Sequence, residues 1–176
     1  MVFGLFKKQK NQNGKYTKTY YSFRSVHADR VLDVAQDGPF KGTTIIWDGY
    51  AGANQCFTLV QEGMNWLIKC KQNNNFLTVE SDANGAKLYL APKSNDPKQR
   101  FRIDENKGST DHFIYTFCGK VLDVAGQGKK NGTQVVQWDY NGGKNQQWNF
   151  CDPKEITSSS SEHDWWQGLM FYTIWL

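Results

Sequence analysis

The sequence predicts an all-β protein with the β-trefoil fold: three strand-and-turn repeats with pseudo-threefold symmetry, plus short N- and C-terminal extensions. The repeats are visible in Leu32, Leu77 and Leu122, which lie 45 residues apart and are each followed two positions later by valine. Each copy also ends in Gln-x-aromatic, and the aromatic residues are Phe57, Phe101 and Trp148. A period of roughly 20 to 50 residues indicates a repeat architecture, and three strand-and-turn copies favour a closed trefoil over a propeller or an open-ended solenoid.

Repeat three, about residues 111–152, shows the unit most clearly. Two β-branched residues lead into Trp138, a polar loop containing glycine follows, and Trp148 closes the unit, which is typical of strand, turn and strand. Upstream, residues 121–124 read Val-Leu-Asp-Val, an alternating strand that contains one acid, Asp123. A buried carboxylate is costly unless it accepts hydrogen bonds, so this aspartate near an exposed tryptophan indicates a polar ligand with an apolar face.

Repeat one, about residues 20–60, carries an aspartate, a tryptophan and an asparagine in the same order as repeat three: Asp33, Trp47 and Asn54. One residue fewer separates the aspartate from the tryptophan here, which predicts a different tilt for the ring of Trp47. The parts of a second ligand site are therefore present in this repeat.

Repeat two, about residues 64–104, keeps the framework but has Thr78, Ala91 and Lys98 at the three corresponding positions. A pocket without a carboxylate or an aromatic plane should not hold such a ligand, so we expect this repeat to be purely structural. Joint presence of three residues in two repeats, and their joint loss in the third, favours a shared ligand over independent structural roles.

Taken together, Leu-Asp-Val near the start of a repeat, Gln-Trp-Asp-Tyr-Asn-Gly-Gly in its middle and Asn-Gln-Gln-Trp at its end resemble the ricin B-chain-like β-trefoil lectins and related carbohydrate-binding modules. The resemblance covers about residues 20–152 and is closest in repeat three. It implies a lectin that recognises galactose, N-acetylgalactosamine or related glycans through shallow sites in repeats one and three. The candidate carbohydrate-binding residues are Asp123, Trp138, Tyr140, Asn145 and Gln146 in repeat three and Asp33, Trp47, Asn54 and Gln55 in repeat one.

The roles that the resemblance implies differ among these residues. Trp138 offers its plane to the apolar face of a sugar, Asp123 accepts from two neighbouring hydroxyls, and Asn145 bonds at the rim. Both Asp123 and Trp138 are expected to face solvent, whereas Gln146 and Gln55 are expected to orient their neighbours. The aromatic residues of the Gln-x-aromatic endings are expected in the core.

Composition excludes several other classes of function. The chain of 176 residues suits one domain, and its net charge of +4 comes from dispersed lysines, which argues against nucleic acid as a partner. Its three histidines lie far apart without ligand spacing, so we expect no enzyme activity, no cofactor and no metal. A non-lectin trefoil that serves as an interaction scaffold or a protease inhibitor stays open as the alternative.

The four cysteines do not match the disulfide framework of the secreted lectins that the chain resembles. Val121 and Tyr140 occupy the positions where those members carry the intra-repeat pair. The apolar run of residues 1–6 is too short for a signal peptide, and its lysines follow it instead of preceding it. We therefore expect the cytoplasm or another intracellular compartment.

The two extensions and a linker complete the expected organisation. Residues 1–19 form an N-terminal extension, residues 153–164 a serine-rich linker, and residues 165–176 a hydrophobic tail that reads WWQGLMFYTIWL. The tail is too short to span a bilayer as a helix and lacks a basic face, so neither a transmembrane segment nor membrane contact is expected. Its apolar side chains need a cover, which is either the trefoil itself or a second copy or other protein bound through Trp165 to Leu176.

Overall fold

The computed structural model describes residues 15–106 and 108–156. The hydrophobic tail of residues 165–176, most of the serine-rich linker and residues 1–14 of the N-terminal extension lie outside the described residues. The cover of the tail and the partner it would bind therefore stay predictions.

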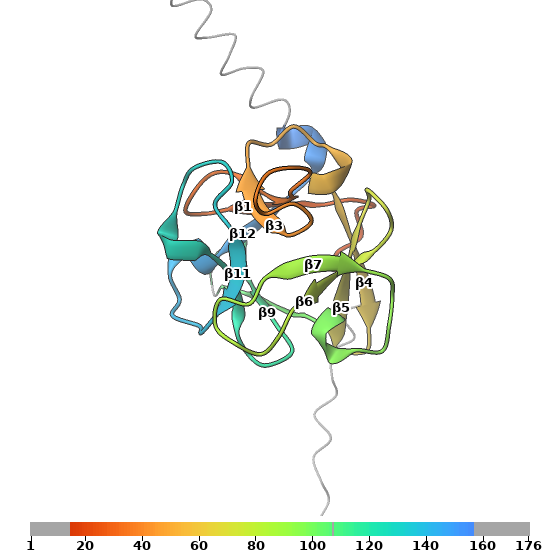
Figure 1. Cartoon of the computed structure of the whole chain (residues 1–176). Coiled ribbons are helices and arrows are strands. Elements are labelled where there is room, and N and C mark those ends of the chain that lie inside the picture. Colours follow the sequence, from red (N-terminus) through yellow and green to blue (C-terminus); the bar gives the residue numbers. More distant parts are fainter. Residues whose placement is uncertain (1–14, 107, 157–176) are drawn as a thin grey trace, which may run out of the picture.

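The described chain is built from twelve short strands, four in each repeat (Figure 1). Repeat one contains β1 (Ser22–Ser25), β2 (Val31–Val34), β3 (Thr44–Trp47) and β4 (Phe57–Glu62). Repeat two contains β5 (Asn65–Cys70), β6 (Phe76–Val79), β7 (Leu88–Ala91) and β8 (Arg102–Glu105). Repeat three contains β9 (Asp111–Tyr115), β10 (Val121–Val124), β11 (Val135–Trp138) and β12 (Trp148–Cys151).

Short 3-10 turns mark equivalent places in the repeats. A turn precedes the last strand of every repeat: η1 (Ala53–Gln55), η2 (Pro97–Gln99) and η4 (Lys144–Gln146). A further turn, η3 (Ala125–Gln127), follows β10. The turns η1, η2 and η4 each end on the glutamine of a Gln-x-aromatic motif, so this motif marks the entry into the last strand of each repeat.

The first and last strands of the three repeats form a closed barrel. Antiparallel ladders join β12 to β1, β4 to β5, β8 to β9 and β9 to β12. Two isolated bridges complete the ring: Tyr21 pairs with Phe57 between β1 and β4, and Trp66 pairs with Phe101 between β5 and β8. Closure removes the exposed sheet edges that an open array of three repeats would leave.

The middle strands of each repeat form the hairpins β2-β3, β6-β7 and β10-β11. Single bridges connect the hairpins to one another, with Thr43 to Tyr89, Ile45 to Gln134 and Lys87 to Val136 as the pairs. Figure 1 shows β3, β7 and β11 arranged around the centre of the view. The predicted all-β trefoil of three repeats is confirmed.

The repeated apolar residues form the core, as predicted. Phe57, Phe101 and Trp148 are fully buried, and the leucine of each repeat, at 32, 77 and 122, is equally inaccessible. Burial of each such side chain contributes about 1.5 to 3 kcal/mol relative to exposure. The Gln-x-aromatic endings therefore anchor the three repeats in one common core.

The folded part of the chain continues past β12. Residues 153–156 form one helical turn, and Ile156 is buried in a small cluster with Val31 and Cys151. A Cβ atom added at Gly49 would lie 2.0 Å from Cγ2 of Ile156, so the chain at this point approaches the backbone after β3 closely. The first residues of the expected linker are thus packed on repeat one.

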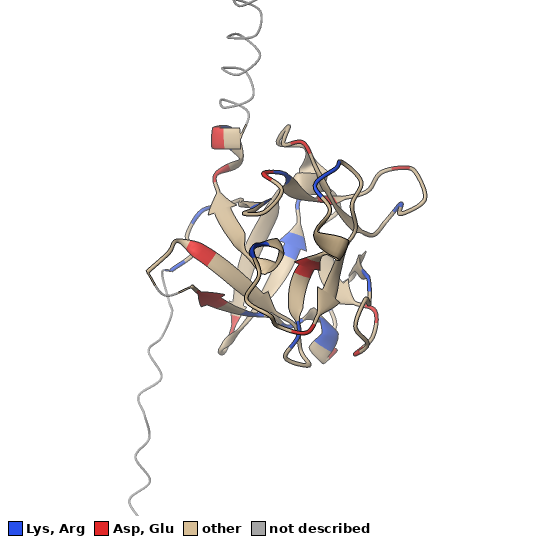
Figure 2. Cartoon of the chain, turned by 90° about the vertical axis from the view of Figure 1, so that its left-hand side faces the viewer, with Lys and Arg blue, Asp and Glu red and all other residues tan. Residues whose placement is uncertain are grey.

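Charged residues are scattered over the described surface. Figure 2 shows basic and acidic positions interspersed, with the lysines and arginines spread over several elements. All four cysteines are free thiols, of which only Cys118 is exposed. Among the described residues there is no helix of the length and apolarity needed to cross a bilayer. The expected intracellular location stays a prediction.

Candidate functional site

Two equivalent cavities lie beside the hairpins of repeats one and three. In repeat one, Asp33 pairs with Ile45 and Val31 with Trp47; in repeat three, Asp123 pairs with Val136 and Val121 with Trp138. The two registers are identical. Repeat one is therefore one residue shorter in the loop between β2 and β3. The strand that leads to Trp47 has its full length, so the shortened approach expected from the sequence is wrong.

The repeat-one pocket has a volume of about 670 Å³, and the repeat-three pocket one of about 520 Å³. Each pocket contains the aspartate, the tryptophan and the asparagine predicted for it. An aliphatic side chain, Ile45 or Val136, lines each pocket opposite the aspartate. Six of the nine predicted site residues thus lie together: Asp33, Trp47 and Asn54 in one pocket, and Asp123, Trp138 and Asn145 in the other.

The two tryptophans present a large exposed surface to these pockets. Trp47 is 41% exposed and Trp138 is 45% exposed, although each ends a strand whose other residues are buried. An exposed indole offers an apolar face with a polar edge, which is suited to a ligand that is itself partly apolar. We refer to Trp47 and Trp138 below as the platform tryptophans.

The two aspartates are buried, at 3% exposure for Asp33 and 6% for Asp123. The expectation that Asp123 faces solvent is therefore wrong, because it lies in the middle of β10, whose four residues are all buried. Burial raises the pKa of Asp33 to about 6 and also raises that of Asp123. Each aspartate nevertheless lines its pocket.

Gln55 and Gln146 hold these carboxylates in place. The side-chain amide of Gln55 donates to Oδ2 of Asp33 at 2.8 Å and to the carbonyl of Asp48 at 2.9 Å. Gln146 makes the same two bonds, both 2.9 Å long, to Asp123 and to the carbonyl of Asp139. Both glutamines are fully buried, and each joins its aspartate to the backbone that follows the tryptophan.

The two asparagines differ in their surroundings. Asn54 donates to the carbonyl of Val34 at 3.2 Å, and its Oδ1 accepts a bond of 2.9 Å from the hydroxyl of Tyr50. Asn145 donates in the same way to the carbonyl of Val124, at 3.3 Å, but Asn141 stands at the position of Tyr50. Besides its tryptophan, the repeat-one pocket is therefore lined by Tyr50 and Phe40, whereas Trp138 is the one aromatic residue among the described residues that line the repeat-three pocket.

Tyr140 lies apart from the other predicted site residues. Its ring packs against Phe113 and Tyr115, with centroid distances of 5.1 and 6.0 Å, and it does not line the repeat-three pocket. The corresponding position in repeat one is Gly49, which faces Ile156. The adjacent residue, Asn141, reaches the pocket in its place.

Sequence reasoning missed a contribution from neighbouring repeats. Asn131 and Gly132 of repeat three line the repeat-one pocket, and Gly85 of repeat two lines the repeat-three pocket. The available signal was the dipeptide Asn-Gly in the hairpin turns of repeats two and three, where repeat one has Lys-Gly. Its partners lie on another repeat, so only the arrangement of the three hairpins shows what it does.

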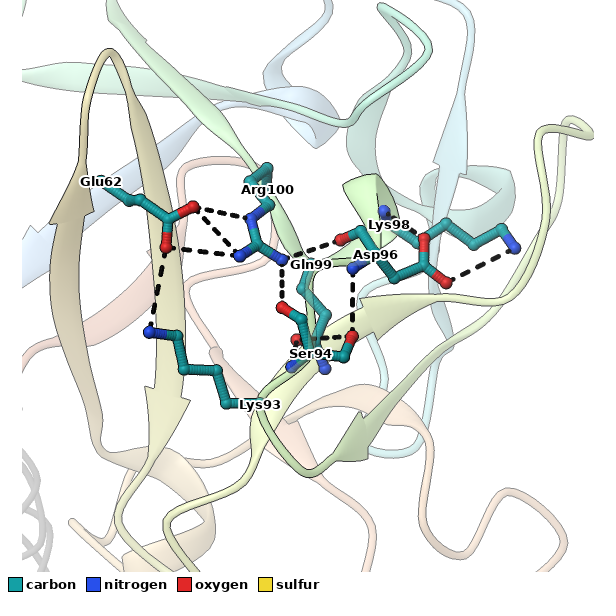
Figure 3. Close-up of polar contacts among 7 residues, drawn as sticks. All are labelled: Glu62, Lys93, Ser94, Asp96, Lys98, Gln99 and Arg100. Carbon is teal, nitrogen blue, oxygen red and sulfur yellow. Dashed lines mark hydrogen bonds and ion pairs between the residues drawn. The ribbon is translucent and has the colours of Figure 1, made fainter.

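In repeat two, the positions that correspond to the pocket residues are occupied by side chains that bond within the repeat. Thr78 replaces the aspartate and accepts a bond of 3.1 Å from Gln99, and Ala91 pairs with Phe76 at the position of the tryptophan. Arg100 donates to Glu62 and to the carbonyls of Ser94 and Asp96, and these bonds fix the loop that follows β7 (Figure 3). The predicted correspondence of Thr78 and Ala91 is confirmed.

The fold and these pockets define a β-trefoil whose hairpins carry paired carboxylate and tryptophan sites. The family model described as "Ricin-type beta-trefoil lectin domain" matches residues 19–148, and the chain belongs to this family.

Individual relatives are more distant. The chain is 26% identical over 109 residues to the main hemagglutinin component type C of Clostridium botulinum C phage, in a match that covers 59% of this chain and 38% of that relative. The designed threefold symmetric protein ThreeFoil has a TM-score of 0.71 and 28% identity, covering 77% of this chain and 99% of ThreeFoil. The Macrolepiota procera ricin B-like lectin in complex with lactose has a TM-score of 0.66 and 23% identity, covering 74% and 93% of the two chains, and shares the fold.

Proposed function

We propose that the protein is a lectin that binds galactose- or N-acetylgalactosamine-type glycans through the repeat-one and repeat-three pockets. The observation that carries this proposal is the placement of a buried carboxylate and an exposed tryptophan on one hairpin, in identical register, in two of three repeats. Family membership supports carbohydrate binding, and the lactose complex of the Macrolepiota procera lectin favours a galactose unit.

The chemistry of the pockets fits a pyranose ring. Such a ring has one face of C–H groups, which stacks on an indole plane, and a rim of hydroxyl groups that need hydrogen-bond acceptors. A carboxylate has two oxygens and accepts from neighbouring hydroxyls, in bonds worth about 1.5 to 3 kcal/mol each. Because Gln55 and Gln146 fix the two carboxylates beforehand, little ordering remains for the ligand to induce.

Two shallow sites on one rigid body suit glycans that are presented in many copies. Each pocket leaves part of its ligand exposed, so single-site affinity should be weak. Attachment at one pocket raises the effective concentration of a second glycan near the other, which strengthens binding to a glycan-coated surface without a new contact. The proposed role is binding alone, with glycans or glycoconjugates as partners and no bond-breaking step.

Titration calorimetry with lactose, and retention on immobilised galactose, test the proposal. The variants are Trp47→Ala, Trp138→Ala and the double variant, each of which removes one or both platforms. The matched control is Tyr89→Ala, which removes an aromatic residue of similar exposure, 40%, from the hairpin of repeat two. We expect each single variant to lose one lactose site and most of its retention on the surface, and the double variant to lose both sites.

A scaffold or inhibitor would behave differently in this experiment. It would pass through the galactose column, and none of the three tryptophan variants would change its heat of mixing with lactose. Equal loss of binding in the Tyr89→Ala control would also contradict the assignment, because this residue lies outside both pockets.

A further inference from the structure

Each of the two pockets is assembled from two repeats. Gly132, in the β10-β11 turn of repeat three, lies so close to Trp47 that an added Cβ would be 3.8 Å from the edge of the indole ring. Gly85, in the turn of repeat two, has the same relationship to Trp138, again at 3.8 Å. Both glycines have positive φ angles, 90° and 83°, which other residues adopt at a cost.

The residue before each glycine makes a two-sided contact with the residue after the platform tryptophan. Oδ1 of Asn131 accepts from the backbone N–H of Asp48 at 2.9 Å, and its Nδ2 donates to the carboxylate of Asp48 at 2.8 Å. Arg30 supports this pair, since its Nε bonds to Oδ1 of Asn131 at 2.7 Å and lies 3.3 Å from the carboxylate of Asp48. The backbone that follows Trp47 is thus held from another repeat.

The same contact occurs at the second pocket with different surroundings. Asn84 accepts from the backbone N–H of Asp139 at 2.9 Å and donates to its carboxylate at 2.8 Å. The bond from Asn84 lowers the pKa of Asp139, and Lys120, at 3.6 Å, acts in the same direction. The backbone that follows Trp138 is therefore held in the same way as that after Trp47.

The third junction between hairpins, where repeat one meets repeat two, has neither the asparagine nor the backbone N–H and carboxylate that it would bond. The hairpin of repeat one meets that of repeat two through the bridge between Thr43 and Tyr89, but its turn carries Lys41 in place of asparagine. The residue after Ala91 is Pro92, which has no N–H to donate. The asparagine is thus absent at the one junction where the platform is absent, although the two positions belong to different repeats.

From this pattern we propose that Asn131 and Asn84 are positioning residues for glycan binding, each holding the platform tryptophan of the neighbouring repeat over its carboxylate. The inference rests on the proposed lectin function. The physical reason is preorganisation: an exposed tryptophan at the end of a strand has freedom in its backbone, and a double hydrogen bond to the next residue removes that freedom before the sugar arrives. The glycine after each asparagine lies beside the indole ring and supplies the positive φ of the turn.

The contact between Asn84 and Asp139 can be tested by exchanging the amide and the carboxylate between the two positions. In a Trp47→Ala background, which leaves one lactose site, Asn84→Asp places two carboxylates against each other. We expect its lactose affinity to fall roughly three- to tenfold, the size that loss of one or two hydrogen bonds produces. Adding Asp139→Asn reverses the polarity of the pair and restores the donor, so affinity should return to within about twofold of the background.

A second measurement reports on positioning without ligand. The indole N–H resonance of Trp138, assigned by its loss in Trp138→Phe, should broaden or shift in Asn84→Asp and return in the exchanged pair. Lys41→Ala, at the junction without a platform, is the matched control and should change neither readout. The thermal midpoint of every variant is measured alongside, to separate positioning from loss of the fold.

The outcomes separate this inference from the proposed function. If the background binds no lactose, the proposed function fails for the repeat-three pocket, and the indole resonance still decides whether Asn84 positions Trp138. If the background binds lactose, unchanged affinity and an unchanged indole resonance in folded Asn84→Asp overturn the positioning role. The positioning role is also overturned if the folded Asn84→Asp, Asp139→Asn variant does not regain the lactose affinity and the indole resonance of the background.

Discussion

The side-chain amide of Gln146 donates a hydrogen bond of 2.9 Å to the carboxylate of Asp123, and both side chains are buried. The same glutamine is the first residue of the motif that ends on Trp148 in the core. One short segment therefore fixes the carboxylate that lines the repeat-three pocket and closes the hydrophobic core. Repeat two keeps the same Gln-x-aromatic motif, but there Gln99 donates to the hydroxyl of Thr78 instead of to a carboxylate.

Asp123→Asn should weaken binding while keeping or raising stability at neutral pH. Burial disfavours the ionised carboxylate, as its raised pKa shows, whereas a neutral amide of the same shape avoids this penalty and can still accept from Gln146. Lactose titration and thermal melting of the variant check the two effects. A lower melting temperature with full lactose affinity would mean that Asp123 serves the fold and not the ligand.

Binding at the repeat-one pocket should depend on pH near 6, the value to which burial raises the pKa of Asp33. The ionised carboxylate is the stronger acceptor, so lactose affinity in a Trp138→Ala background should increase as pH rises through about 6 and then level off. Asp33→Asn is the control, and its affinity should not change over this range.

The contribution of Asp33 to stability should have the opposite sign. Its folded pKa lies above the usual 3.8, so the folded protein binds the proton more tightly than the unfolded chain does. This contribution is therefore greatest at low pH and declines as pH rises from about 4 to about 6. Denaturant melts of the wild type and Asp33→Asn across this range measure the difference, and parallel curves for the two proteins would contradict the raised pKa.

Thr78→Ala should leave lactose binding unchanged, because repeat two has neither carboxylate nor platform. The substitution removes the hydroxyl that accepts from Gln99 at 3.1 Å and donates to the carbonyl of Phe76 at 3.0 Å. We expect a loss of about 0.5 to 1.5 kcal/mol in the free energy of unfolding, measured by denaturant titration. A measurable loss of affinity would show that repeat two takes part in binding.

Ile156→Ala should lower the free energy of unfolding by about 2 to 5 kcal/mol, since it removes a buried side chain that packs with Val31 and Cys151. Gly49→Ala should destabilise the same contact from the other side, because its new methyl group would overlap Ile156. Chemical denaturation checks both variants. Truncation after Ile156 should then be milder than truncation after Asp152, and equal stability of the two truncated chains would contradict this packing role.

Much of this arrangement could be predicted from the sequence, because the relevant information repeats along the chain. Three evenly spaced copies of Leu-x-Val and Gln-x-aromatic predict the strands, the core and the closed fold. Comparison of the copies also separates Asp33 and Asp123, which keep their tryptophan, from Thr78, which does not. Six predicted site residues consequently lie in the two pockets.

The features that escaped prediction depend on contacts between distant residues. The burial of Asp123 follows from its covering by the hairpin and by Gln146, and alternation along one strand does not reveal it. Tyr140 lies outside the pocket because its ring packs on Phe113, which belongs to β9. The contacts of Asn131 and Asn84 join different repeats, so the spacing within one repeat contains no trace of them.

The two isolated bridges that complete the barrel have a consequence for amide proton exchange. Tyr21 and Phe57 exchange two backbone hydrogen bonds, of 2.8 and 2.9 Å, and Trp66 and Phe101 exchange two more, of 2.7 and 2.9 Å. All four residues are buried, so water can reach these amides only when the first and last strands of a repeat separate and the barrel opens. The exchange rates of these four protons should therefore converge on one value, that of whole-barrel opening, while amides in the turns between β2 and β3 or between β10 and β11 exchange independently and faster.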